Sequence, residues 1–135
     1  MLFLAKQPLG KVSYTADIAK VEQIPASFLA KVINQLAKGG LVISRRGPTG
    51  GLELARAASD ITLRDIMEAI EGEIAINVCT SSQDYTCFRS GCSLKGAFHQ
   101  AQVKFLESLD STTLAQLTSD DQYAPSLVAE AVGAS

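Results

Sequence analysis

The sequence predicts a mainly helical protein that carries one small β-hairpin. Apolar residues recur at helical spacing in residues 26–38 and 93–109, and two short apolar runs flank a Gly/Pro cluster at residues 47–51. The chain has 135 residues, of which 47% are hydrophobic and 19% are charged. This composition supports one folded domain, alone or with an appendage, and excludes a disordered chain.

Three helices are expected before the hairpin. Residues 2–6 resemble the end of a helix, and Ser13 or Thr15 can cap a short second one. Pro25 lies near the first position of a longer helix that runs to Lys38. The apolar stripe of this longer helix, which we expect to face the core, comprises Phe28, Leu29, Val32, Ile33 and Leu36.

Two strands and a further helix are expected next. Residues 41–44 and 52–55 form the hairpin strands on either side of the Gly/Pro cluster. Thr62 and Asp65 have the spacing of a capping box, and they open a helix that ends near Glu71. Its inward residues are Leu63, Ile66, Met67 and Ile70.

The last predicted helix spans residues 93–109 and follows an irregular segment, residues 73–92. Its apolar positions 94, 98, 101, 105 and 109 are close to a coiled-coil seam, so we expect it to form a dimer rather than an internal core. Its expected polar face comprises Lys95, Gln100, Gln102, Lys104 and Glu107. The chain is therefore divided into a head (1–72), a segment with cysteines (73–92), a dimerisation helix with a short following helix (93–118) and a flexible tail (119–135).

Charge is distributed unevenly along the chain. The net charge is −2, but residues 1–56 hold eight basic and three acidic side chains, whereas residues 57–135 hold four basic and eleven acidic ones. A basic first part favours contact with a polyanion. No glycine-rich phosphate loop and no Ser/His/Asp pattern is present, so an enzyme is not expected. No apolar run approaches the roughly 18 residues of a membrane helix, and we expect a cytoplasmic protein without membrane contact.

A short helix, a turn, a second helix and a basic hairpin together predict a winged helix-turn-helix, which binds double-stranded DNA. The second helix would enter the major groove with Ala26, Ser27, Ala30 and Lys31 near its start. Ser27 can donate to a base or a phosphate, and Lys31 is expected to contact a phosphate. The hairpin places Arg45, Arg46 and Gly47 near a narrow minor groove. The alternative is a protein-interaction adaptor with the same fold.

Three cysteines, Cys79, Cys87 and Cys92, lie within 14 residues. An odd number of cysteines without a secretion signal does not indicate a disulfide framework. Three thiolates can hold an iron–sulfur cluster or zinc, and Cys92 precedes a helix whose dipole favours a thiolate. The alternative is three separate inert thiols. His99, the only histidine, lies about two helical turns beyond Cys92 and is expected on the surface.

The chain resembles the Rrf2 family of bacterial winged-helix transcription regulators, the type that includes IscR, NsrR and CymR. The resemblance covers roughly residues 1–118. It rests on residues 17–19, 24–29, 36–42, 44–56 and 61–66, on Glu71-Gly72 and on the three-cysteine segment.

This resemblance implies a homodimer with a DNA-binding head and a long dimerisation helix. It implies a [2Fe–2S] or [4Fe–4S] cluster on Cys79, Cys87 and Cys92, recognition-helix contacts by Ser27 and Lys31, and Arg46 as the wing arginine. Lys95 stands where some members have a histidine. A subset of the family has no cluster and senses a small molecule or a protein partner.

We therefore expect a dimeric repressor whose affinity for its DNA operator depends on an iron–sulfur cluster. Order in residues 73–92 would set the spacing of two recognition helices near one DNA turn, about 34–36 Å. The alternatives are a cluster-free regulator that senses thiol oxidation or a small effector, and the adaptor.

Overall fold

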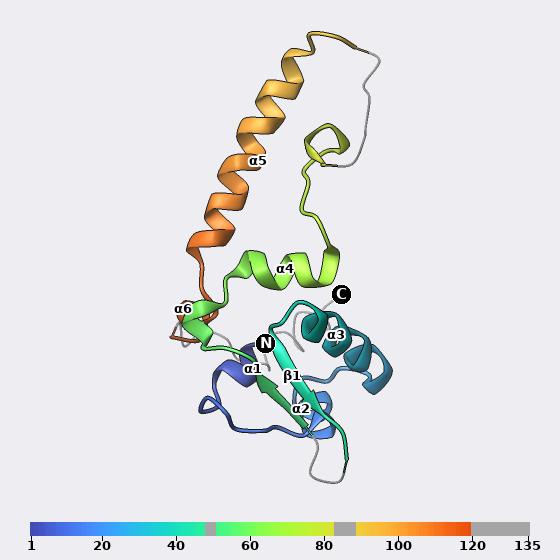
Figure 1. Ribbon diagram of the computed structural model, residues 1–135, viewed down its shortest axis with the longest axis vertical. Coiled ribbons are helices and arrows are strands. Elements are labelled where there is room, and N and C mark those ends of the chain that lie inside the picture. The colour runs from blue at the N-terminus through green and yellow to red at the C-terminus, as the bar shows by residue number, and fades with distance from the viewer. Residues whose placement is uncertain (48–50, 83–88, 120–135) are drawn as a thin grey trace, which may run out of the picture.

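The computed structural model describes residues 1–47, 51–82 and 89–119. Helices surround a two-stranded antiparallel sheet to form a head, from which one long helix projects (Figure 1). The hairpin lies at one end of the longest axis and the start of the long helix at the other (Figure 1). The predicted fold class, mainly helical with a small hairpin, is confirmed.

The head begins with helices α1 (Leu2–Ala5), α2 (Thr15–Val21) and α3 (Ala26–Lys38). The predicted cap of α2 is wrong: Tyr14 is the N-cap residue, and no side chain caps the helix. The backbone of Ser13 instead exchanges two hydrogen bonds with Leu52, of 2.8 and 2.7 Å. Pro25 is the N-cap residue of α3, one position before the place expected.

The core of the head lies between α3, the hairpin and the neighbouring helices. Helix α3 buries Leu29, Ile33 and Leu36 there. Phe28 was expected in the core, but 58% of its surface is exposed. The buried stripe of α3 therefore starts one residue later. The remaining core residues are Leu4, Ile18, Leu41, Val42, Leu52, Leu54, Ile61 and Leu114.

The hairpin consists of β1 (Val42–Arg45) and β2 (Gly51–Leu54), with Val42 opposite Leu54 and Arg45 opposite Gly51. Each strand lies within one residue of its expected position. Gly51 is required because a Cβ atom there would lie 2.5 Å from Val12 Cγ1 and 2.6 Å from the Ser13 carbonyl oxygen. This close approach places the hairpin against the segment before α2.

The hairpin is followed by the 3-10 turn η1 (Ala58–Asp60) and helix α4 (Leu63–Glu71), which packs on α3. The predicted capping box of α4 is confirmed. The Thr62 hydroxyl accepts from the Asp65 amide at 3.1 Å, and the Thr62 amide donates to the Asp65 carboxylate at 3.0 Å. A second 3-10 turn, η2 (Val78–Thr80), lies in the segment expected to be irregular.

Helix α5 (Ser93–Ser111) is two residues longer than expected, and α6 (Leu114–Ser119) follows it. The chain returns to the head after α5, because the Leu114 amide donates to the Ile61 carbonyl and the Leu63 amide to the Thr112 carbonyl, both at 2.8 Å. Leu114 is fully buried in the core of the head. Within the described ranges, no helix is both long and apolar enough to cross a bilayer.

Candidate nucleic-acid interface and thiol segment

The outer face of α3 gathers the predicted DNA-contacting residues of this helix. Ala26, Ser27, Ala30 and Lys31 are all exposed. A shallow hollow on this face is lined by Ser27, Phe28, Ala30, Lys31 and Asn34. Ser27 and Lys31 can donate hydrogen bonds, and an aromatic ring in the major groove can contact a thymine methyl group.

Phe28 and Asn34 are the two residues of this face that the sequence interpretation missed. Ser27, Ala30, Lys31 and Asn34 have the spacing i, i+3, i+4, i+7, which marks one face of a helix. Phe28 lies three residues before Lys31, at the edge of this face. The pattern was present in the sequence, but the apolar character of Phe28 favoured its assignment to the core.

The wing places two adjacent arginines in different surroundings. Arg45 donates through Nη2 and Nε to Glu53 Oε1 on β2, at 2.8 and 3.2 Å. The Glu53 side chain is only 8% exposed, whereas that of Arg45 is 62% exposed. Arg46 and Gly47 are exposed, and in the part of the chain that the structure describes Arg46 makes no ion pair. Arg46 therefore presents the uncompensated positive charge of the wing.

Helix α3 is also fixed by contacts with α4. Gln35 Nε2 donates to the Ile70 carbonyl in the last turn of α4 at 2.9 Å. A Cβ atom at Gly39 would lie 2.8 Å from the Ala69 Cβ atom, so the two helices approach closely there. The orientation of α3 thus depends on the position of the end of α4.

The cysteines lie in the segment between α4 and α5, residues 73–92, which we call the thiol segment. Cys79 is in η2 and Cys92 is the N-cap residue of α5. Both are free and partly exposed, whereas Cys87 lies outside the described residues. Among the residues described, no group of three or more His, Cys, Asp or Glu side chains could hold a metal ion. Thiolates are ligands that iron–sulfur clusters and zinc prefer, and Cys79 and Cys92 are two such groups in this segment.

The first half of the thiol segment is anchored at both of its ends. Gln102 accepts from the Ile76 amide at 2.8 Å through Oε1 and donates to the Ile74 carbonyl through Nε2. The Glu73 carboxylate accepts from the Ser82 amide at 2.6 Å and from the Ser81 hydroxyl at 3.0 Å. The hydrogen bonds from Ser82 and Ser81 lower the pKa of Glu73.

Two expectations for α5 are wrong at particular residues. Gln102 was expected on the polar face, but it is buried against the thiol segment. Leu109 was expected in the dimer seam, but it is buried within the subunit. Leu94 and Phe105 are 62% and 40% exposed, so they do form an apolar strip on the surface. His99 is exposed, as expected.

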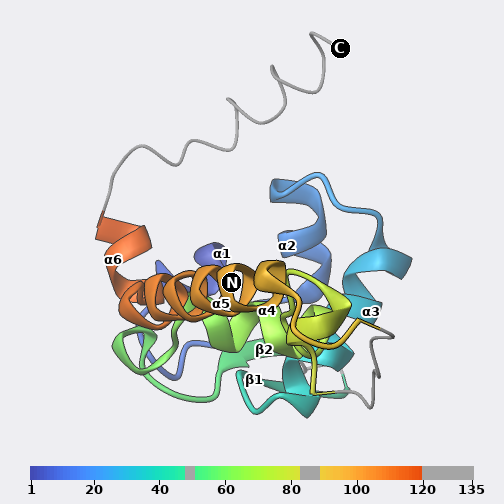
Figure 2. The same ribbon diagram turned by 90° about the horizontal axis from the view of Figure 1, so that it is seen from above.

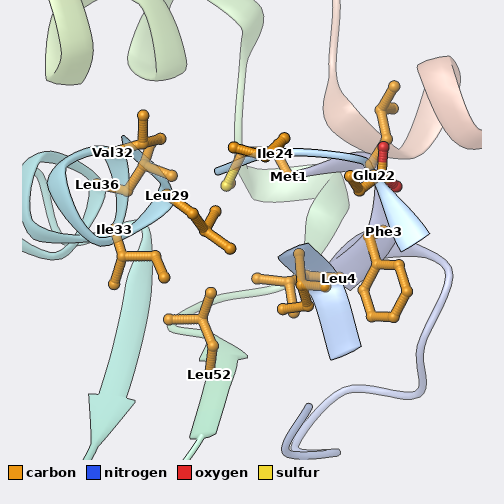
Figure 3. A pocket seen from close by; sticks show the side chains of 12 residues that line it. Met1, Phe3, Leu4, Glu22, Ile24, Leu29, Val32, Ile33, Leu36 and Leu52 are labelled. Atoms are coloured by element: carbon orange, nitrogen blue, oxygen red, sulfur yellow. The ribbon is translucent and has the colours of Figure 1, made fainter. Parts of the chain in front are cut away.

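A cavity of about 320 Å³ lies behind the recognition helix, between α1, α2, α3 and β2 (Figure 3). Its walls are apolar except for Glu22, whose carboxylate lies at one side among the lining side chains (Figure 3). Leu29, Ile33 and Leu36 of α3 contribute to its wall. A small apolar molecule in this space would contact the inner face of α3.

A family model described as an iron-dependent transcriptional regulator, Rrf2, matches residues 1–120. The chain belongs to the Rrf2 family. Members of this family are transcription regulators rather than enzymes, so this Rrf2 protein is a DNA-binding transcription regulator with a winged-helix head.

Solved structures agree with this assignment. CymR of B. subtilis, described as its global cysteine regulator, is 27% identical with a TM-score of 0.72, over 87% of this chain and 86% of that one. IscR of T. potens is 28% identical with a TM-score of 0.64, over 91% of this chain and 82% of that one. CymR of Staphylococcus aureus, at 24% identity and a TM-score of 0.67 over 91% and 89% of the two chains, shares the fold.

Proposed function

We propose that this Rrf2 regulator is a dimeric cytoplasmic repressor whose operator affinity is controlled by an iron–sulfur cluster on Cys79, Cys87 and Cys92. The observation that carries the proposal is the anchored thiol segment, which joins the end of α4 to the start of α5 and has a free thiol in each described part. Helix α4 in turn supports the recognition helix through Gln35. The family's description as iron-dependent supports iron as the signal.

Each part of the chain has its own proposed role. Residues 1–72 would bind the duplex, residues 73–92 would sense the signal, residues 93–118 would form the dimer contact, and residues 119–135 would form a tail. Ala26, Ser27, Ala30 and Lys31 would face the major groove, and Arg45, Arg46 and Gly47 would face the backbone and minor groove. A bound cluster would supply an iron- and redox-sensitive connection between the three thiolates.

Two subunits would place their recognition helices about 34–36 Å apart, which is one turn of B-DNA. Only with the thiol segment held in one arrangement would both heads fit adjacent major grooves. Loss of that arrangement would lower affinity by shifting the population of dimers away from this register.

Anaerobic purification tests the cofactor. We expect visible absorbance with measurable iron and sulfide, and we expect both to be lost when all three cysteines are changed to Ala. Protein that stays colourless and iron-free after anaerobic reconstitution would contradict the cluster.

Fluorescence anisotropy with duplex DNA tests DNA binding by the head. The affinity should fall steeply as the salt concentration rises, and Ser27→Ala should relax the preference at one base pair by about 1 kcal/mol.

The second candidate is a cluster-free regulator that senses thiol oxidation or a small effector. The similarity to the cysteine regulator CymR favours it, and the apolar cavity behind α3 gives an effector a place beside the recognition helix. Mass spectrometry under peroxide distinguishes the two candidates, because a crosslink between cysteines that changes DNA affinity would support thiol sensing. Absence of any DNA binding at low salt would instead favour a protein-interaction adaptor.

A further inference from the structure

Gln102 is a buried amide on a helix whose other sides are largely exposed. Only 6% of its surface is accessible, and its carboxamide bonds the backbone of residues that precede it by 26 and 28 positions. Burial of an amide is unfavourable unless its donor and acceptor are both used. Here both are used, so the side chain fixes one register of the thiol segment against α5, as a neighbouring strand would.

This register determines where Cys79 lies relative to Cys92. Ile76, the donor to Gln102, is three residues before Cys79, and Glu73 ties the far side of η2 through Ser81 and Ser82. Cys92 caps the same helix that carries Gln102, ten residues away or about 15 Å along the axis. One side chain therefore sets the relative placement of both described thiols.

The other end of the anchored stretch leads to the DNA-contacting face. The residues bonded by Gln102 lie two and four positions after Gly72, the C-cap residue of α4. Ile70, two residues earlier, accepts the hydrogen bond of Gln35 from α3. The last turn of α4 and two to four residues of non-helical chain connect the groups that the two glutamines bond.

We infer that Gln102 and Gln35 are positioning residues that couple the thiol segment to the recognition helix. The inference rests on the proposed function and names the route of its regulation. A change at Cys79 or Cys92 that displaces residues 74–76 also displaces the end of α4, and Gln35 transfers this displacement to α3. The hydrogen bonds of both side chains in the described part of the chain go to backbone groups and not to a cysteine.

The test uses Gln102→Met, which keeps the length and bulk of the side chain but removes both hydrogen bonds, in the full-length, reduced, metal-free protein. Gln100→Met is the matched control, because Gln100 is exposed on the same helix. We expect alkylation of Cys79 by iodoacetamide to become at least about fivefold faster, because loss of even one of the two net hydrogen bonds corresponds to that factor. The NMR resonance of the Gln35 side-chain amide should shift in Gln102→Met and not in Gln100→Met.

Unchanged alkylation and an unmoved Gln35 resonance in a folded Gln102→Met variant would overturn the inference. If that variant does not fold, Gln35→Met is used instead. Hydrogen exchange of the Ile76 amide should then be faster than in the unaltered protein, and an unchanged exchange rate would overturn the inference. A different result would show that the proposed function is wrong: the DNA affinity of the unaltered protein would then be the same with and without reconstituted iron. Where that affinity does respond to iron, the response should fall at least about fivefold in Gln102→Met.

Discussion

Arg45 and Arg46 are neighbours in the sequence with the same charge, yet the structure gives them different tasks. Arg45 is paired with a buried carboxylate, so part of its charge is already compensated. Arg46 makes no ion pair within the described residues and can neutralise a phosphate. We therefore expect Arg45 to stabilise the wing and Arg46 to supply affinity for DNA.

Arg45→Ala should therefore lower mainly the stability of the protein, and Arg46→Ala should lower mainly its affinity for DNA. Arg45→Ala leaves Glu53 buried without its partner and should lower the free energy of unfolding by about 1–2 kcal/mol. Arg46→Ala should change it by less than about 0.5 kcal/mol, yet weaken binding to all duplexes and reduce the salt slope by about one. Urea unfolding and salt-dependent anisotropy measure the two effects. Equal unfolding midpoints in both variants would contradict these roles.

Glu73 gives the thiol segment a dependence on acid. Because the hydrogen bonds from Ser82 and Ser81 lower its pKa, the ionised form is the one that holds the segment. This contribution is complete above the ordinary titration range of glutamate and is lost as the pH falls through the lowered pKa. The Ser82 amide resonance, followed by NMR from pH 7 downward, should move only at a pH below the ordinary titration range of glutamate. In Glu73→Gln this movement should be absent; a midpoint above the ordinary glutamate value would contradict the prediction.

Residue types and spacing predicted which residues share the exposed face of α3, but not the contacts between distant segments. The exposure of Ser27, Lys31 and Arg46 was predictable because their helix and hairpin are local structures. The burial of Gln102 depends on a contact with residues 26 and 28 positions earlier, which helical periodicity does not contain. The ion pair of Arg45 with Glu53 likewise depends on strand register, since Glu53 lies opposite Ile43.

At the level of elements, side-chain caps were predictable only where a reciprocal pair was present. Thr62 and Asp65 supply both halves of a capping box and form it. Ser13 and Thr15 have no such pair, and the Ser13 backbone pairs with Leu52 instead. Strand ends moved by one residue because Arg45 and Gly51 pair across the hairpin. Tertiary contacts therefore set the boundaries that local propensity left open.

The cap of α4 should contribute measurably to stability. Thr62→Ala removes the acceptor for the Asp65 amide and should cost about 1 kcal/mol in the free energy of unfolding. Thr15→Ala is the matched control, because Thr15 begins α2 without a cap bond, and its cost should stay within about 0.5 kcal/mol. Urea denaturation measures both. A Thr15→Ala cost as large as that of Thr62→Ala would show that the cap adds nothing.

At the level of the whole molecule, the long helix stands clear of the head with an apolar strip exposed (Figure 1). Viewed from above, α5 lies over the head (Figure 2), where α4 and η2 pack against one side of it. Leu94 and Phe105 are 11 residues apart, about three full turns, so they share one side of the helix. Exposed apolar surface of this kind is typical of a face that joins subunits.

Leu94→Glu should dissociate the proposed dimer and weaken operator binding, because a charge in the seam would be buried. Val103 is the matched control: it is 42% exposed on the same helix, but nine residues from Leu94 places it about half a turn away, on the opposite side. Val103→Glu should leave the mass unchanged. Sedimentation equilibrium reports both, and a wild-type mass of one subunit at all concentrations would contradict the proposed dimer.

The two ends of the molecule are far apart, which has a consequence for timing. The wing lies at the bottom of the long axis, and Cys92 precedes a helix of 19 residues, about 28 Å long, whose start lies at the top (Figure 1). A small oxidant or a metal chelator can therefore reach Cys92 while the head remains seated on a duplex. Under the proposed function, a promoter would respond as fast as the thiols react, without first waiting for the protein to leave.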